Sequence, residues 1–242
     1  MRRRFFVDQF TGSSAVIEGD AAHHLGHVLR AQAGQLYELS DGLSAWLARI
    51  ESVARNCVEF SLLEQLPSQP PAVNVSLLLA IVKFDAFEWA LEKATELGVS
   101  SIVPLAAARS EKGLLAAAAK RSQRWQKILY EASQQSRRLC VPLLDNVSKP
   151  AQAFVAPPPK IRLLLSERID APSIRTSLAS ANRTKVASAA LAIGPEGGWT
   201  DDELAAACAS GFQEASLGQL ILRTETAVIA ALATLNYALS PD

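Results

Sequence analysis

Leu191-Ala-Ile-Gly-Pro-Glu-Gly-Gly-Trp-Thr200 carries the most informative local pattern in this chain. Its first three residues are apolar and predict a buried strand, and Gly194–Gly198 then holds three glycines and a proline. Glycine lets a backbone bend sharply and approach a ligand closely, whereas proline stiffens it. Thr200 and Glu203 fit a capping box at the start of a helix. The stretch therefore predicts a strand, a tight loop and a helix.

A second stretch, Leu217-Gly-Gln-Leu-Ile-Leu-Arg-Thr-Glu-Thr-Ala227, has the same character. An apolar strand is expected to end at Leu217, and Thr224 is the predicted N-cap of a last, mostly apolar helix. Neither stretch fits the dinucleotide fingerprint or the Walker phosphate loop, because the glycine spacing differs and no Lys-Ser/Thr follows. Two interpretations remain open: two ordinary turns between strand and helix, or two facing loops that hold one small ligand by main-chain groups.

Length and composition bound the possibilities. The 242 residues are 49% hydrophobic, enough for a full core in one or two domains. The 24 basic and 24 acidic residues balance, so an argument for nucleic-acid binding must be local. The three cysteines lie far apart without metal-ligand spacing, which favours free thiols in a reducing compartment. The apolar run Ala72–Val82 is too short to span a membrane, so we expect a cytoplasmic protein.

Pro67-Ser-Gln-Pro-Pro71 is the best domain boundary, because a proline-rich segment is stiff and extended. Before it, turn signals separate short apolar runs, and Asp41-Gly42 predicts a hairpin between residues 35–39 and 45–50. Asp20 is the expected N-cap of a short helix that carries His24 and Leu25. The N-terminal third is therefore predicted as a small β-rich domain.

After the linker, apolar strands alternate with helices. Strands are predicted at 73–82, 101–105, 161–165, 189–193 and 214–217, and helices at 85–97, 120–138, 201–210 and 224–239. The alanine-rich residues 114–119 are expected to form a less ordered or shortened loop. This alternation indicates a parallel sheet covered on both faces. The last helix has no wide polar stripe, so it is either core or a subunit interface.

Positive charge is concentrated between Arg109 and Arg138, which hold eight basic residues against Glu111 and Glu131. Such a run is usually a solvated helix face. In a neutral protein, however, this concentration favours a surface that follows RNA phosphates. His23 and His27 are four residues apart, but no third or fourth ligand lies nearby, so polar or RNA contact is favoured over zinc.

The two glycine-bearing stretches together resemble the ribosomal small-subunit RNA methyltransferases that methylate N3 of a uridine, a branch of the SPOUT class. Supporting segments are Arg4-Phe-Phe6, His23-His-Leu25, Val28-Leu-Arg30, Lys93-Ala-Thr-Glu-Leu-Gly-Val99 and Gln134-Gln-Ser-Arg137. The resemblance implies an α/β fold in two parts: a small N-terminal PUA-like β-barrel domain, residues 1–71 with the linker, that binds RNA, and a C-terminal parallel-sheet domain, residues 72–242, with a deep trefoil knot. Strand spacing does not predict a knot, which is rare.

The resemblance also implies a cofactor, partners and site residues. The cofactor is S-adenosylmethionine, and the partners are 16S ribosomal RNA in the small subunit and a second copy of the chain, with no metal. Cofactor binding is expected from Leu165, Ile193, Gly194, Pro195, Glu196, Gly197, Gly198, Leu217, Gly218, Leu220 and Leu222. RNA contact is expected from Arg2, Arg3, Arg4, His24, Arg30, Arg121, Arg124, Arg137 and Arg138.

Arg223 and Glu225 are the implied catalytic residues. From the residues alone, a salt bridge between Arg223 and Glu196 or Glu225 would be preferred. The resemblance makes Arg223 a guanidinium that stabilises the uracil anion once N3 has lost its proton. The base stays open among Glu225, Glu196 and solvent. The alternatives are a non-catalytic RNA-binding or ribosome-assembly module of the same fold, or a methyltransferase acting on a ribose 2′-hydroxyl or on transfer RNA.

Overall fold

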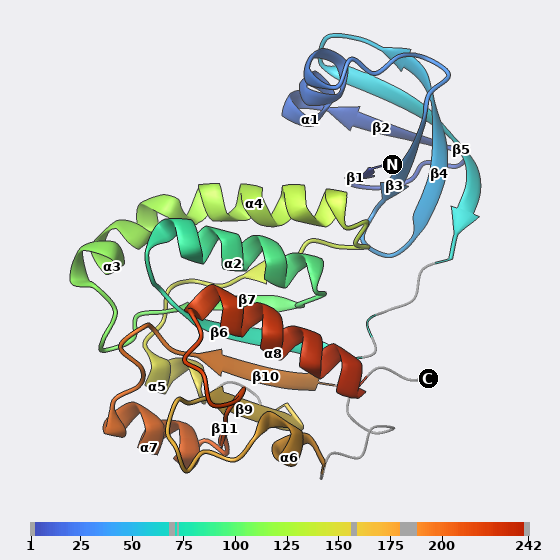
Figure 1. Ribbon diagram of the computed structural model, residues 1–242. Helices are drawn as coiled ribbons and strands as arrows, with labels where there is room; N and C mark the ends of the chain where they lie inside the picture. Colours follow the sequence, from blue (N-terminus) through green and yellow to red (C-terminus); the bar gives the residue numbers. More distant parts are fainter. Residues whose placement is uncertain (1–2, 68–70, 72, 156–158, 180–187, 240–242) are drawn as a thin grey trace. The chain divides into compact units, whose positions relative to one another are not determined.

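The computed structural model describes residues 3–67, 71, 73–155, 159–179 and 188–239, so the predicted RNA contact Arg2 lies outside the described residues. The chain divides into two compact units, shown with their elements in Figure 1. Unit 1 comprises Met1–Pro70 and Tyr130–Val141, and unit 2 comprises Pro71–Leu129 and Pro142–Asp242.

Unit 1 is built on a curled five-stranded sheet in the order β1-β3-β4-β5-β2. Its strands are β1 (Arg4–Phe6), β2 (Ser14–Glu18), β3 (Leu36–Ser40), β4 (Ala45–Val53) and β5 (Cys57–Leu66). β1 pairs parallel with β3, and the other neighbours are antiparallel. Alternate residues face one core, in which Phe5, Leu39 and Phe60 are buried. The predicted hairpin is confirmed, because β3 and β4 pair across Asp41-Gly42.

The short helical segment after β2 differs from its prediction. α1 (Gly19–His23) has Glu18 as its N-cap, with no side-chain hydrogen bond, so the prediction that Asp20 is the cap is wrong. The helix continues as a π-helix, η1 (His24–Val28), in which the Leu29 N–H donates to the His24 carbonyl. The His23 and His27 rings, four residues apart, are stacked with centroids 4.6 Å apart.

Residues Tyr130–Val141 complete unit 1 although they lie far along the chain. The Tyr130 ring lies 5.4 Å from that of Phe6, and the Ser40 hydroxyl donates to the Leu139 carbonyl at 2.7 Å. The helix expected over residues 120–138 is α4 (Ser122–Gln135), whose last turns belong to this unit. Sequence periodicity could not show that α4 would belong partly to unit 2 and partly to unit 1.

Unit 2 contains a six-stranded sheet in the order β11-β9-β10-β6-β7-β8, with every neighbouring pair parallel. The strands are β6 (Asn74–Ala80), β7 (Ser101–Leu105), β8 (Leu143–Leu144), β9 (Ile161–Leu165), β10 (Ser188–Ile193) and β11 (Gln213–Ala215). β6 and β10 are central and almost wholly apolar, because both of their faces are covered. The predicted parallel sheet is confirmed.

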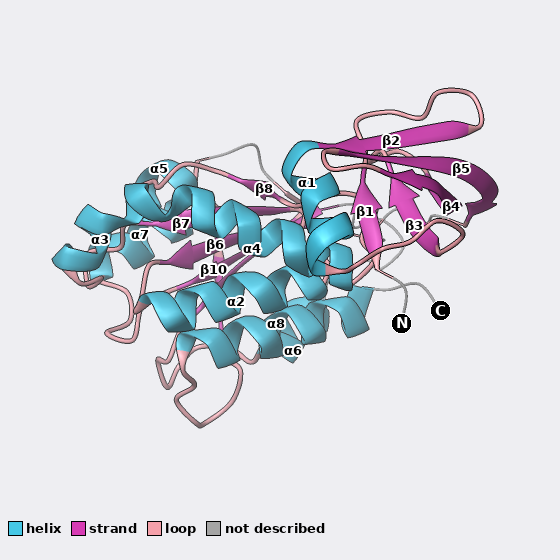
Figure 2. Ribbon diagram, turned by 90° about the horizontal axis from the view of Figure 1, so that it is seen from above, coloured by secondary structure: helices cyan, strands magenta, loops and turns pink. Residues whose placement is uncertain are grey.

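Helices cover both faces of this sheet. They are α2 (Phe84–Glu96), α3 (Lys112–Ala118) with a 3₁₀ turn η2 (Ala119–Arg121), α5 (Pro150–Ala153), α6 (Ile174–Ala179), α7 (Asp201–Ala209) and α8 (Thr224–Leu239). Figures 1 and 2 show α2 and α8 side by side over one face, and Figure 1 shows α5 and α7 at the other. α2 buries Phe87, Leu91 and Ala94 and gives way to Gly98, whose φ of 89° suits the end of a helix.

Three predictions for unit 2 are corrected. Residues 114–119 are mostly helical rather than a loop, because alanine and leucine favour helix when a neighbouring segment packs against them. Thr224 is the first residue of α8 instead of its N-cap. The strand expected over 214–217 ends at Ala215, which leaves Leu217 in the loop that follows.

Candidate functional site

A cavity of about 440 Å³ opens at the carboxyl ends of β9 and β10, in unit 2. Ligands of parallel α/β sheets characteristically bind at this end of the strands. The loop after β10 and the loop after β11 both line it, and so do all eleven residues predicted to contact a cofactor. Two stretches that are separate in sequence are therefore brought together around one space.

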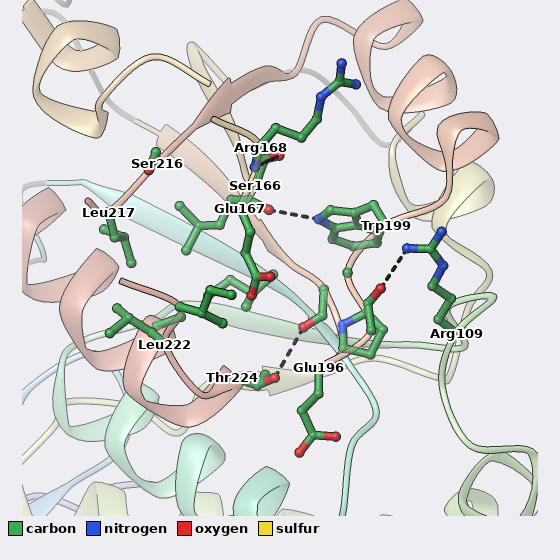
Figure 3. A pocket seen from close by; sticks show the side chains of 18 of the residues that line it. Arg109, Ser166, Glu167, Arg168, Glu196, Trp199, Ser216, Leu217, Leu222 and Thr224 are labelled. Carbon is green, nitrogen blue, oxygen red and sulfur yellow. Dashed lines mark hydrogen bonds between the residues drawn. The ribbon is translucent and has the colours of Figure 1, made fainter. Parts of the chain in front are cut away.

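Trp199 packs against Gly194 and stabilises the loop after β10. A side-chain carbon built on Gly194 would lie 3.0 Å from the Trp199 ring, so a larger residue would require the ring or the loop to shift by a few tenths of an ångström. The indole Nε1–H donates to the Leu165 carbonyl at 2.9 Å, which ties this loop to the end of β9 (Figure 3). Gly198 closes the turn with a φ of 68° and donates its N–H to the Pro195 carbonyl at 2.8 Å. The Trp199 indole thus lines the cavity and fixes the position of this loop.

Arg109, in the loop after β7, braces the same glycine loop from its other side. Its Nη1 donates to the Gly197 carbonyl at 2.7 Å, as Figure 3 shows. Its aliphatic stem covers Gly197 so closely that an added side-chain carbon would lie 3.3 Å from the Arg109 Cβ. The neighbouring Ala108 N–H donates to Glu203 Oε1 at 2.8 Å. Two polar contacts therefore dock the loop after β7 onto the glycine loop and α7.

The predicted capping box of α7 is confirmed. Thr200 Oγ1 accepts from the Glu203 N–H at 3.3 Å, and Glu203 Oε2 accepts from the Thr200 N–H at 2.9 Å. One carboxylate oxygen of Glu203 thus accepts a hydrogen bond at the start of α7, and the other accepts one from the loop after β7.

The loop after β11 forms the opposite wall. The Ser216 N–H donates to the Pro172 carbonyl at 2.8 Å, and Gly218 has a φ of 133°, a conformation that side chains rarely adopt. Leu217 and Leu222 turn into the cavity in Figure 3, whereas Leu220 is 82% exposed at its edge. A long hydrogen bond of 3.4 Å from the Thr224 hydroxyl to the Gly194 carbonyl joins the two loops.

The predicted catalytic residues do not line the cavity. Arg223 is exposed immediately before α8, between the lining residues Leu222 and Thr224. Glu225 is buried in the first turn of α8. The charged residues that do line the cavity are Arg109, Glu167, Arg168, Glu196 and Asp201.

Several basic residues predicted to contact RNA are paired with carboxylates. Arg4 is 9% exposed, and its Nη2 lies 2.9 Å from Glu38 Oε2. Arg137 lies 3.3 Å from the other oxygen of Glu38. The Arg4 guanidinium is thus buried and bonded to a carboxylate of its own unit, and removing either partner would leave a buried charge uncompensated. Contact of Arg4 with RNA stays a prediction.

The other predicted RNA residues lie nearer to solvent. Glu88 on α2 accepts from Arg121 at 3.1 Å and from Arg124 at 2.7 Å, so its carboxylate orients both guanidinium groups. The Arg138 Nε–H donates to the Cys140 carbonyl, and burial lowers the pKa of Arg138. Arg3 and Arg30 are exposed, Arg30 with a φ of 51°, and His24 is half-buried in η1.

The described part of the chain contains no cluster of three or more histidine, cysteine, aspartate or glutamate side chains arranged to hold a metal ion. It also contains no helix with the length and apolar character needed to cross a bilayer.

Comparison with known proteins shows the family of this chain. A family model described as an RNA methyltransferase domain matches residues 69–236. The ribosomal RNA small subunit methyltransferase E of Synechocystis sp. is 35% identical over 233 residues, covering 95% of this chain and 75% of that protein. The Bacillus subtilis protein of the same name is 31% identical over 228 residues, covering 91% and 89%. The chain belongs to the ribosomal RNA small subunit methyltransferase E family.

Solved structures agree with this assignment. A methyltransferase E from Neisseria gonorrhoeae, bound to S-adenosyl methionine, has a TM-score of 0.86 and 29% identity, covering 98% of both chains. A Legionella pneumophila methyltransferase with bound SAM gives the same values. The resemblance inferred from the two glycine-bearing stretches is therefore confirmed at the level of the family.

Sequence reasoning missed several residues of the methyltransferase E cavity. Ser166, Glu167 and Arg168 follow β9 and line it, and Trp199 is its floor. Position after the end of a predicted parallel strand is a signal that could have found the first three. Trp199 offered no such signal, because its role depends on a carbonyl 34 residues away.

Proposed function

We propose that this chain is an S-adenosylmethionine-dependent methyltransferase that methylates N3 of a uridine in 16S ribosomal RNA of the small subunit. The observation that carries the proposal is the convergence of the two glycine-bearing loops on one cavity. Membership of the methyltransferase E family and relatives solved with the bound cofactor support it.

The residues present fit the cofactor. A cavity of about 440 Å³ lies within the range of small-molecule sites, about 300–1,000 Å³. Leu165, Ile193, Leu217 and Leu222 offer apolar walls for an adenine ring. Gly194 and Gly197 have no side chains that could cover their main-chain groups. Trp199 and Arg109 pack closely against these two glycines. When bound, S-adenosylmethionine supplies a methyl group activated by its sulfonium.

The chain's own residues then act on the uridine. N3 must lose its proton before its electron pair can attack the methyl carbon, while the carbon–sulfur bond breaks and sulfur keeps its electrons. We assign Arg223 to the uracil anion, since it lies between two residues of the cavity wall and its guanidinium is exposed. Glu225, Glu196 and water are the candidate acceptors of the proton. Positioning by the two loops supplies much of the rate.

The finer architecture also belongs to this proposal. We infer a PUA-like RNA-binding barrel in unit 1 and a trefoil knot in unit 2, where β10 lies between β9 and β6 and two loops converge. We further infer a cytoplasmic homodimer that packs through α8, whose outer face exposes Ala233 and Tyr237. Sedimentation at micromolar concentration tests the dimer, and a monomer would contradict it.

The function is tested by mass spectrometry of 16S ribosomal RNA from cells that lack this gene. We expect 3-methyluridine to disappear and to return when the gene is restored. An unchanged 3-methyluridine signal would remove the proposal, and loss of a 2′-O-methyl group or a transfer-RNA methyl group would redirect it. Titration of the purified protein with S-adenosylmethionine separates an enzyme from a non-catalytic RNA-binding module, which would give no heat of binding.

A further inference from the structure

Glu167 places a carboxylate in the cavity. It lies two residues after Leu165, where the chain leaves β9, and it is one of the charged residues lining the space. Figure 3 shows its side chain directed into the space between the glycine loop and Leu222, whereas Glu196 points away from that space. Glu167 is therefore the acidic side chain best placed to meet a ligand held between the two loops.

The backbone that carries Glu167 is fixed on both sides. The Leu165 carbonyl accepts from the Trp199 indole at 2.9 Å, and the Ser166 N–H donates to the Ala215 carbonyl at 3.0 Å. The Arg168 N–H donates to Ser166 Oγ at 3.3 Å. A backbone held in this way loses little conformational freedom when the residue binds a ligand.

Its carboxylate is also available. The structure gives Glu167 no hydrogen bond or ion pair to any residue in the described part of the chain. The adjacent Arg168 directs its guanidinium away from Glu167 in Figure 3, and its Nε lies 3.4 Å from Asp170 Oδ1. An ionised carboxylate only accepts hydrogen bonds, so its natural partners are hydroxyl or ammonium donors of a ligand.

We propose that Glu167 is a cofactor-contacting residue that accepts hydrogen bonds from the ribose hydroxyls of S-adenosylmethionine. This inference rests on the proposed function. Leu165 and Leu222 would hold the adenine, and its ribose would then lie in the same cavity that Glu167 lines. Carboxylates bind ribose hydroxyls in the same way at the strand ends of dinucleotide-binding folds. Glu167 then determines specificity for a ribonucleoside cofactor.

Calorimetry with six ligand and protein combinations tests the inference. S-adenosylmethionine, S-adenosylhomocysteine and the 2′-deoxy analogue of S-adenosylhomocysteine are each titrated into the wild type and into Glu167→Ala. We expect the wild type to bind the deoxy analogue about tenfold more weakly, because a charged acceptor loses its donor. Glu167→Ala is expected to bind S-adenosylhomocysteine about tenfold more weakly than the wild type does, and to discriminate little between S-adenosylhomocysteine and its deoxy analogue.

Two results would overturn the inference. One is Glu167→Ala discriminating between S-adenosylhomocysteine and its deoxy analogue as strongly as the wild type. The other is Glu167→Ala losing affinity for S-adenosylmethionine alone, which would mean that the carboxylate acts on the sulfonium charge. A melting curve for each variant checks that it is folded. Glu167→Gln, which keeps the shape of the side chain, is a second variant for the same titrations. Asp170→Asn removes a carboxylate of the same loop that does not line the cavity, so it should behave as wild type.

Failure of the proposed function gives a different pattern. If the wild type binds neither S-adenosylmethionine nor S-adenosylhomocysteine, the cofactor assignment itself is wrong, and the inference about Glu167 falls with it. If the wild type binds both and Glu167→Ala changes nothing, only the inference about Glu167 falls.

Discussion

At the scale of single residues, two glycines of the loop after β10 are tightly packed by their neighbours. Gly194 faces the Trp199 ring and Gly197 faces the stem of Arg109. Both neighbours also hold the loop by hydrogen bonds, Trp199 through the Leu165 carbonyl and Arg109 through the Gly197 carbonyl. Because Gly194 and Gly197 have no side chains, Trp199 and Arg109 can pack directly against the loop and fix its shape.

Gly194→Ala should disturb this arrangement. The added carbon at 3.0 Å from the Trp199 ring forces the ring or the loop to move. We expect a loss of about 1–3 kcal/mol of stability from overpacking. Affinity for S-adenosylmethionine should fall by on the order of tenfold, because small displacements of positioning groups are costly. Calorimetry and thermal denaturation measure the two effects.

Gly113→Ala is the matched control for that substitution. It adds a carbon within α3, where the nearest atom is Glu111 Oε1 at 3.8 Å, so affinity should be unchanged. Equal affinity of Gly194→Ala and wild type for the cofactor would show that the indole contact does not shape the loop.

At the scale of elements, the turn between β3 and β4 depends on one carboxylate. Asp41 Oδ1 accepts from the N–H groups of Leu43 and Ser44, at 2.9 and 2.7 Å. Burial by itself would raise the pKa of Asp41, but these hydrogen bonds outweigh it and lower the pKa below the ordinary value of 3.8. The turn is thus stabilised by the ionised form.

This shift predicts a dependence of stability on pH. A carboxyl whose pKa is lower in the folded state contributes stability above its unfolded pKa and loses that contribution as the pH falls through the folded pKa. The melting temperature of the wild type should therefore exceed that of Asp41→Ala at neutral pH, and the difference should shrink below about pH 4. Asp41→Asn can accept the same bonds without titrating there. A difference between wild type and Asp41→Ala that stays constant down to pH 2 would contradict the assignment.

Glu203 joins two elements, the start of α7 and the loop after β7. Glu203→Ala removes the cap on Thr200 and the acceptor of the Ala108 N–H, so we expect a loss of about 1–2 kcal/mol in the free energy of unfolding. Chemical denaturation measures it. Asp202→Ala removes an exposed carboxylate of the same turn and should cost about 0.3–1 kcal/mol. Equal costs for the two variants would mean that neither the bond to Thr200 nor the Ala108 contact adds stability beyond that of the charge.

At the scale of the whole molecule, the described cavity belongs to unit 2, while Tyr130–Val141 belongs to unit 1. Deleting residues 1–66 should leave affinity for S-adenosylmethionine within about twofold and abolish methylation of the small subunit, if unit 1 binds the RNA. It should also lower the melting temperature, because Tyr130, Arg137 and Leu139 lose Phe6, Glu38 and Ser40. Titration calorimetry and a subunit methylation assay check both parts. Methylation retained by the truncated protein would refute this division of labour.

Much of the fold could be predicted because its signals are local. The apolar run in β6, the capping box of Thr200 and Glu203, and the glycine that follows α2 each act within a few residues. The helix α3 could also have been read from its alanine and leucine residues, which have high helix propensity. The start of α1 could not, because its N-cap Glu18 makes no side-chain hydrogen bond.

The order and spacing of neighbouring residues were enough to predict the parallel sheet, the two glycine-bearing loops and the family. The contacts that hold those loops, and the charges that face the cavity, became known only from the folded chain. Trp199 bonds a carbonyl 34 residues away and Arg109 one 88 residues away, and Arg4 is neutralised across 34 residues by Glu38. The physical reason is that a side chain's partner is fixed by how the elements pack, and packing depends on the whole chain at once.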